Sequence, residues 1–111
     1  MKMKICIPKE GEHVSPHFGH TPEFALFTVE DGKVTSSDVI VNPGHEPGIL
    51  PRLMAQHNVT HVVTGGIGKR AQDMFCDLNI TVFPGASGKI DEVLNAFLNG
   101  TLESGSNLCD H

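Results

Sequence analysis

The chain of 111 residues has no long apolar run and only three cysteines. The first apolar stretch covers only Ile5 to Ile7 before Pro8, which is too short for a signal-peptide core, and no stretch approaches a membrane span. An odd number of widely spaced cysteines also argues against a disulfide framework. We therefore expect a cytoplasmic protein with reduced thiols and no membrane partner.

Basic residues are scarce as well. Eight Lys and Arg against thirteen Asp and Glu give a formal charge of −5, and no basic cluster is present. This balance argues against binding to the phosphates of nucleic acids. It also means that imidazoles and backbone N–H groups would have to hold any anionic ligand locally, because the overall field opposes it.

The common catalytic motifs are missing too. The chain contains no Walker loop, no complete dinucleotide-binding fingerprint and no Gly-x-Ser-x-Gly elbow. No Cys or Ser lies beside an evident general base, and Glu10, Glu12 and Asp31 do not form a convincing pair of catalytic carboxylates. The sequence therefore shows none of these common catalytic motifs.

The apolar pattern predicts a single α/β domain, a size that the length supports. Three helices are expected, with apolar stripes from Leu50 to His57, from Ile67 to Leu78 and from Ile90 to Leu98. Asp31-Gly32 indicates a hairpin turn. The order predicts a mixed sheet of about five strands with helices on its faces. The expected strands are at residues 3–8, 24–30, 33–41, 60–64 and 79–83.

Histidine is the residue type that stands out, with seven in the chain and three in the loop of residues 11–22. Imidazole is a common protein ligand for borderline metals. Ligands gather beyond the carboxyl ends of parallel strands, so this loop should meet residues 42–48 and 65–68 there. The first two of these loops hold His13, His17, His20 and His45.

Three further features bear on a metal or anion site. Cys109 and His111 lie two positions apart near the carboxyl terminus and could reach one metal ion. The turn from Gly65 to Gly68 fits an anion cradle and a plain strand-to-helix turn about equally well. Cys6 is expected to be a small core residue, and Cys76 has no assigned role.

Residues 14–24, 45–51 and 63–71 together resemble the dinitrogenase iron–molybdenum cofactor family, that is, the small domain of the NifX and NifB carboxyl-terminal type. The blocks that carry the resemblance are Ser-x-His-Phe-Gly and Gly-Gly-Ile-Gly-x-x-Ala, in this order and spacing. The similarity continues through residues 79–88 into residues 98–102. It implies a ribonuclease H-like fold and an iron–molybdenum cofactor-binding-like domain over residues 1–100. The tail at 101–111 has little to bury and is expected to be flexible. Its ending, Cys109-Asp110-His111, resembles that of a free-standing subgroup of the family.

The resemblance implies binding or carriage of a metal–sulfur cluster, either the iron–molybdenum cofactor used by nitrogenase, a precursor or a related cluster. Its partners would be cluster donor and acceptor proteins. The alternatives are a simple zinc-type metal binder or regulator and, ranked last, a metal-dependent hydrolase with Glu12 or Glu46 as the base. Imidazoles would coordinate metal, and hydroxyl and backbone N–H groups would bond the sulfides. The expected site residues are Ser15, Gly65, Gly66 and Gly68, with the metal ligands His13, His17, His20, His45, Cys109 and His111.

Overall fold

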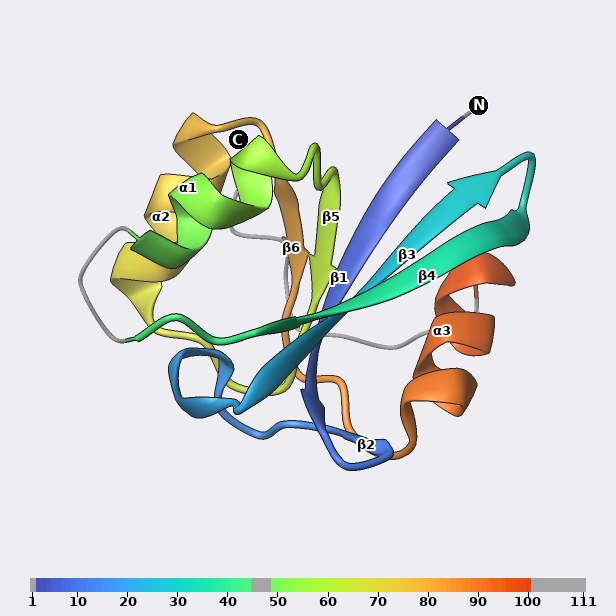
Figure 1. The fold of residues 1–111 in the computed structure, drawn as a ribbon, viewed down its shortest axis with the longest axis horizontal. Helices are drawn as coiled ribbons and strands as arrows, with labels where there is room; N and C mark the ends of the chain where they lie inside the picture. Colours follow the sequence, from blue (N-terminus) through green and yellow to red (C-terminus); the bar gives the residue numbers. More distant parts are fainter. Residues whose placement is uncertain (1, 45–48, 101–111) are drawn as a thin grey trace.

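The structure, a computed structural model, describes residues 2–44 and 49–100, and strand β1 (Lys2–Glu10) runs through its centre. β1 pairs antiparallel with β3 (Glu23–Glu30) and parallel with β5 (His61–Val63). β4 (Lys33–Val41) extends the sheet beyond β3, and β6 (Thr81–Phe83) extends it beyond β5. The order is β4-β3-β1-β5-β6, with the two-residue β2 (His13–Val14) paired to β1 (Figure 1). The predicted mixed sheet is confirmed.

The hairpin between β3 and β4 forms at the predicted turn. Asp31 has φ 53° and Gly32 has φ 82°, so both turn positions are left-handed, as a tight hairpin requires. The prediction that the first strand ends at Pro8 is wrong, because β1 continues to Glu10. Pro8 is tolerated there because the ladder to β5 has already ended at Cys6, two residues earlier.

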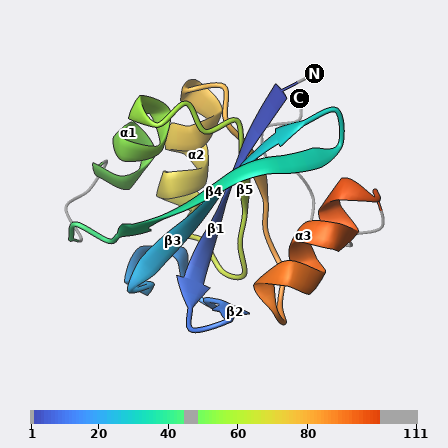
Figure 2. The same cartoon turned by 45° about the vertical axis from the view of Figure 1, so that its right-hand side comes forward.

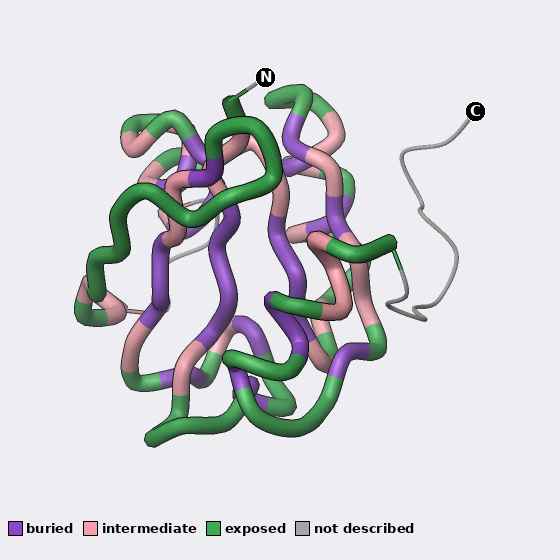
Figure 3. Tube along the Cα trace, turned by 90° about the vertical axis from the view of Figure 1, so that its right-hand side faces the viewer, coloured by how far each residue is buried: buried purple, intermediate pink, exposed green. Residues whose placement is uncertain are grey.

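The helices cover both faces of the sheet. α1 (Ile49–Gln56) and α2 (Lys69–Asp77) lie on one face, and α3 (Ile90–Leu98) lies on the other (Figures 1 and 2). Each face has its own core, and the buried residues follow the central strands (Figure 3). The core under α1 and α2 includes Cys6, Phe18, Phe24, Met54, Val62 and Phe75. The core under α3 includes Ile5, Ile7, Val29, Val63, Val93 and Leu94.

Two expectations about side chains can be compared with this core. Cys6 is fully buried, which confirms the prediction that it is a small core residue. Leu78 was expected in the apolar stripe of the second helix but is 40% exposed. α2 ends at Asp77, and Leu78 is the residue that caps it, so its side chain no longer follows the helical stripe. Among the described residues, no helix is long and apolar enough to cross a membrane.

Candidate functional site

Three chain segments meet where the parallel strands β1, β5 and β6 end. The Phe18 N–H donates to the Gly66 carbonyl at 2.9 Å, and the Gly66 N–H donates to the Pro16 carbonyl at 2.6 Å. The Gly85 N–H, after β6, donates to the Gly65 carbonyl at 2.8 Å. These bonds tie the loop after β1 and the loop after β6 to the turn between β5 and α2. Two of the three predicted loops therefore meet at the predicted edge, and the described beginning of the third, residues 42–44, bonds the end of the first through Asn42.

The first two glycines of this turn are required by close approach. A Cβ on Gly66 would lie 2.7 Å from the Pro16 carbonyl oxygen, and a Cβ on Gly65 would lie 3.1 Å from the Pro16 Cα. Gly68 has nothing within 4 Å of its Cβ position. Because the Gly66 N–H already bonds Pro16, it is not free for a ligand, and the contribution of this residue is steric.

His17 and His20 form the exposed part of the site. His17 precedes the single-turn helix η1 (Phe18–His20), and the two ring centroids are 6.3 Å apart with the rings nearly perpendicular. Two imidazoles on one tetrahedral metal, each with a metal–nitrogen distance of about 2.0–2.1 Å, hold their centroids roughly 5 Å apart. The two rings lie somewhat farther apart than that, so a shared metal would draw their centroids closer by about 1 Å.

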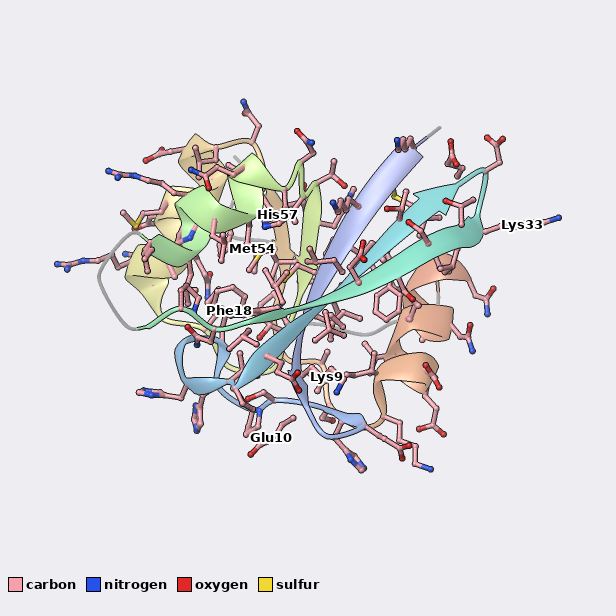
Figure 4. The ribbon with its side chains drawn as sticks, in the orientation of Figure 1. Lys9, Glu10, Phe18, Lys33, Met54 and His57 are labelled. Carbon is pink, nitrogen blue, oxygen red and sulfur yellow. The ribbon has the colours of Figure 1, made fainter. Side chains whose placement is uncertain are left out.

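Phe18 anchors the loop between these two histidines. Its ring is buried and points inward beneath α1 and α2 (Figure 4), with centroids 5.0 Å from Phe24 and 5.5 Å from Phe75. Burial of this ring leaves its two histidine neighbours on the outside. Beside them is an open depression of about 350 Å³. Its lining residues are His17, Phe18, Gly19, His20, Gly66, Ile67 and Gly68.

The amino end of α2 borders this depression. Gly68 is its N-cap and supplies no side-chain cap, so the first N–H groups of the helix have no intrahelical acceptor. Lys69 and Arg70 follow, both exposed, and neither forms an ion pair within the described part of the chain. The helix dipole and two cations therefore make this rim locally positive although the whole chain is acidic.

Two amide side chains hold the loops around the site. The Gln72 Nε2–H donates to the Ile67 carbonyl at 3.3 Å, and the Asn42 Nδ2–H donates to the Thr21 carbonyl at 2.8 Å. Asn42 thereby places the described beginning of the loop after β4 against the end of η1. The Gln72 Oε1 and the Thr64 hydroxyl are buried and have no hydrogen-bond partner within residues 2–44 and 49–100.

The remaining predicted ligands lie elsewhere or cannot be placed. Ser15 is buried, and its hydroxyl donates to the His17 carbonyl at 3.2 Å, so it shapes the loop from inside. His13 lies on β2, which is at the other end of this edge from η1 (Figure 1). Its backbone forms an isolated antiparallel β-bridge with Lys89. The expected meeting of His13 with the other histidines is therefore not found. His45, Glu46, Cys109 and His111 lie outside the described residues.

Within residues 2–44 and 49–100, no three His, Cys, Asp or Glu side chains gather as a metal site. The described site is thus a pair of imidazoles beside a positive helix end. Sequence reasoning missed Asn42, Lys69, Arg70 and Gln72. The adjacent Lys69-Arg70 pair directly after the Gly-rich turn was the available signal for the positive rim, but the net charge concealed it.

Comparisons with known proteins agree with this geometry at the level of the family. The model of the family described as dinitrogenase iron–molybdenum cofactor matches residues 1–100. The uncharacterised protein MJ0580 of Methanocaldococcus jannaschii is 32% identical over 106 residues, covering 91% of this chain and 90% of that protein.

Solved structures share the fold. The crystal structure of PH0822 has a TM-score of 0.87 at 36% identity and covers 92% of this chain and 94% of its own. The apo form of the orange protein from Desulfovibrio gigas has a TM-score of 0.78 at 19% identity, with 95% and 94% covered, which shows likeness of fold alone. Because the family match spans residues 1–100, the chain belongs to the dinitrogenase iron–molybdenum cofactor family.

Proposed function

We propose that this protein binds and carries a metal–sulfur cluster, which is the iron–molybdenum cofactor, a precursor of it or a related cluster, without catalysing a reaction. The observation that carries the proposal is the exposed pair His17 and His20 next to the uncapped amino end of α2. The membership of the chain in the iron–molybdenum cofactor family supports the same cargo.

The donor set suits a cargo that must leave again. Two imidazoles on an open rim leave most of a cluster's coordination sphere for other ligands, whereas a closed cage of four thiolates would hold it permanently. Cys6 does not offer a competing thiolate, because burial raises its pKa far above the ordinary value. Exchange with donor and acceptor proteins is therefore chemically possible at this rim.

The surroundings of the pair suit an anionic cargo. Sulfide-bridged clusters carry negative charge, and N–H groups that point at their sulfides stabilise them. The first-turn N–H groups of α2 and the charges of Lys69 and Arg70, which directly follow the lining residue Gly68, supply positive potential near the depression. In this proposal His17 and His20 bind a metal of the cluster, and the helix end receives its sulfides.

The enzymatic alternative has less support. Glu12 lines a different depression, together with Lys89 and Asp91 near the start of α3, and not the one beside His17. A zinc-type site would combine His17 or His20 with His45, Cys109 or His111, which lie outside the described residues. We also propose that the strand order β4-β3-β1-β5-β6 belongs to the ribonuclease H-like topology that the family resemblance implies.

The test is cluster loading and transfer under anaerobic conditions. The protein is incubated with iron–molybdenum cofactor or precursor, separated from free cluster, and analysed for bound metal and for charge-transfer absorption. The double variant His17→Ala/His20→Ala should lose loading and transfer. The matched control is His13→Ala, which also removes an exposed imidazole but on β2.

Unchanged loading of the double variant would refute the proposed ligands. A colourless protein that binds one zinc ion per chain and takes up no cluster would instead favour the simple metal binder. Turnover of a phosphate or amide substrate with stoichiometric metal would favour the hydrolase.

A further inference from the structure

Strand β4 forms one edge of the sheet and is exposed over nearly its whole length. It spans nine residues, pairs with β3 on one side, and within the described part of the chain no strand pairs with its other side. Every residue from Lys33 to Val39 is exposed, and so is Val41. Such an edge presents a row of unpaired backbone N–H and C=O groups, which natural proteins normally cover or protect with charges and prolines.

This edge is also apolar. Of the four large apolar side chains that are exposed in the described residues, three lie on β4, namely Val34 at 42%, Val39 at 51% and Val41 at 73%. The fourth is Leu78, which caps the carboxyl end of α2 and does not belong to the sheet. Exposed valines concentrated on one unpaired strand indicate a surface that is covered in the functional state.

The three valines share one face of the sheet. Val34 and Val39 lie opposite Val29 and Ala25 of β3 in the ladder, and Val29 belongs to the core under α3. Residues that lie opposite each other project to the same side, and Val41 follows Val39 by two positions. The stripe is therefore on the α3 side, at the margin of the sheet that α3 leaves open (Figure 2).

We propose that β4 pairs with β4 of a second copy of this chain in antiparallel orientation, which would make a two-fold symmetric dimer with one sheet continuous across both subunits. A two-fold interface brings the same patch of both subunits together, so the strand has to be complementary to itself. β4 meets this requirement, because it contains no proline and its side chains on each face are small or β-branched apart from Lys33 and Asp38.

The charges on the strand are compatible with this pairing. The register to β3 shifts at Thr35, so the regular part of β4 covers residues 36–41. With the two-fold axis at Ser37, Asp38 lies opposite Ser36. With the axis at Val39, Asp38 lies opposite Ile40. Neither register places like charges directly opposite each other, which would be destabilising. Lys33 extends away from the body of the molecule at one end of the strand (Figure 4), where it would remain in solvent.

The test measures the mass of the whole chain by light scattering after size exclusion, over a range of concentrations. The wild type should show twice its 12.0 kDa chain mass at high concentration. Val39→Lys should weaken the dimer at least about tenfold, because it places two like charges at the interface. Leu78→Lys is the matched control, since it replaces an exposed apolar residue off the strand and should leave the dimer unchanged.

Hydrogen exchange supplies a second readout that does not require a variant. The amides of β4 should exchange more slowly as the wild-type concentration rises, and those of the short opposite edge β6 should not respond. A wild type that stays monomeric at about millimolar concentration overturns the proposal. So does a Val39→Lys protein that folds and dimerises like the wild type.

Discussion

Gly66 lies where the loop after β1 comes closest to the turn after β5, and its missing side chain is a structural requirement. The bond of its N–H to the Pro16 carbonyl is short, at 2.6 Å, and leaves no room for a Cβ. The histidine pair depends on this contact, because the same strand-like bridge joins His17 to Gly66. At the scale of single residues, the site is therefore positioned by a glycine that contributes no chemistry.

Gly66→Ala should lower the free energy of unfolding by about 1–3 kcal/mol, because its Cβ would have to displace the Pro16 carbonyl by several tenths of an ångström. Gly68→Ala, in the same turn, meets nothing within 4 Å and has φ −70°, so it should cost less than about 1 kcal/mol. Urea unfolding of both variants measures the difference. Equal losses would show that the close approach is not what selects glycine here.

His61 predicts a pH dependence of stability. Its ring stacks on Phe83 with centroids 6.2 Å apart, packs edge-on to Phe97, and has Nδ1 2.7 Å from the Thr60 hydroxyl. Burial lowers the pKa of His61 below its ordinary value of 6.5. The neutral ring is therefore favoured in the folded state, and the stability linked to it is present above pH 6.5 and lost as the pH falls through the lower folded pKa.

The free energy of unfolding of the wild type should thus decrease between about pH 7 and about pH 5, and His61→Gln should decrease less over the same interval because it has no ring to protonate. Urea titrations at several pH values, with the His61 ring followed by NMR, measure both quantities. Parallel pH profiles of the two proteins would exclude His61 as the source.

At the scale of elements, α2 and η1 act together. Phe75 of α2 is fully buried and meets Phe18 of η1 edge-on, so the helix that offers its amino end to the depression also supports the loop that carries the histidines. α3 lies on the other face with a separate core. Damage to the two faces should therefore have different consequences for the site.

Phe75→Leu and Val93→Ala should each lower the free energy of unfolding by about 1–3 kcal/mol, since both leave space in a packed core. Only Phe75→Leu should also weaken cluster loading, because it loosens the support of Phe18. Loading assays under conditions in which both variants are folded, checked by circular dichroism, measure the difference. Equal loading by the two variants would show that the packing of Phe75 against Phe18 does not support cluster binding by the histidine loop.

At the scale of the whole molecule, local and overall charge have opposite signs. The chain carries a formal charge of −5, whereas Lys69 and Arg70 follow directly after the N-cap of α2. An anionic cargo is repelled at long range and attracted close to the rim, so the local pair should govern how fast it binds. Salt at 0.1 M largely screens the interactions between exposed charges that lie more than about 10 Å apart.

Lys69→Gln/Arg70→Gln should slow cluster uptake roughly tenfold at low salt and reduce its dependence on salt. The charge-matched control is Lys2→Gln/Lys4→Gln, which makes the same change of net charge at the amino end of β1, away from the depression. Stopped-flow absorption at several ionic strengths measures the rates. Equal slowing in both double variants would assign the effect to net charge rather than to the helix end.

The fold was largely predictable because its signals are local. The alternation of β-branched runs with apolar stripes predicted the mixed sheet and the three helices, and β4 has the predicted bounds, Lys33–Val41. The wrong predictions concern positions whose structure depends on an adjacent strand or on where a helix ends. Pro8 remains in a strand because β5 is short, and Leu78 is exposed because α2 ends one residue earlier.

Local patterns in the chain are enough to specify the α/β class, the hairpin at Asp31-Gly32 and the loop that carries His17 and His20, since these depend on periodicity and on the conformational range of single residues. Which groups meet is set by the tertiary structure. It pairs His17 with His20, leaves His13 at another corner, buries Ser15 and brings the end of α2 to the rim. Those contacts join residues far apart in the chain, and no local pattern encodes distances between loops that parallel strands bring to one edge.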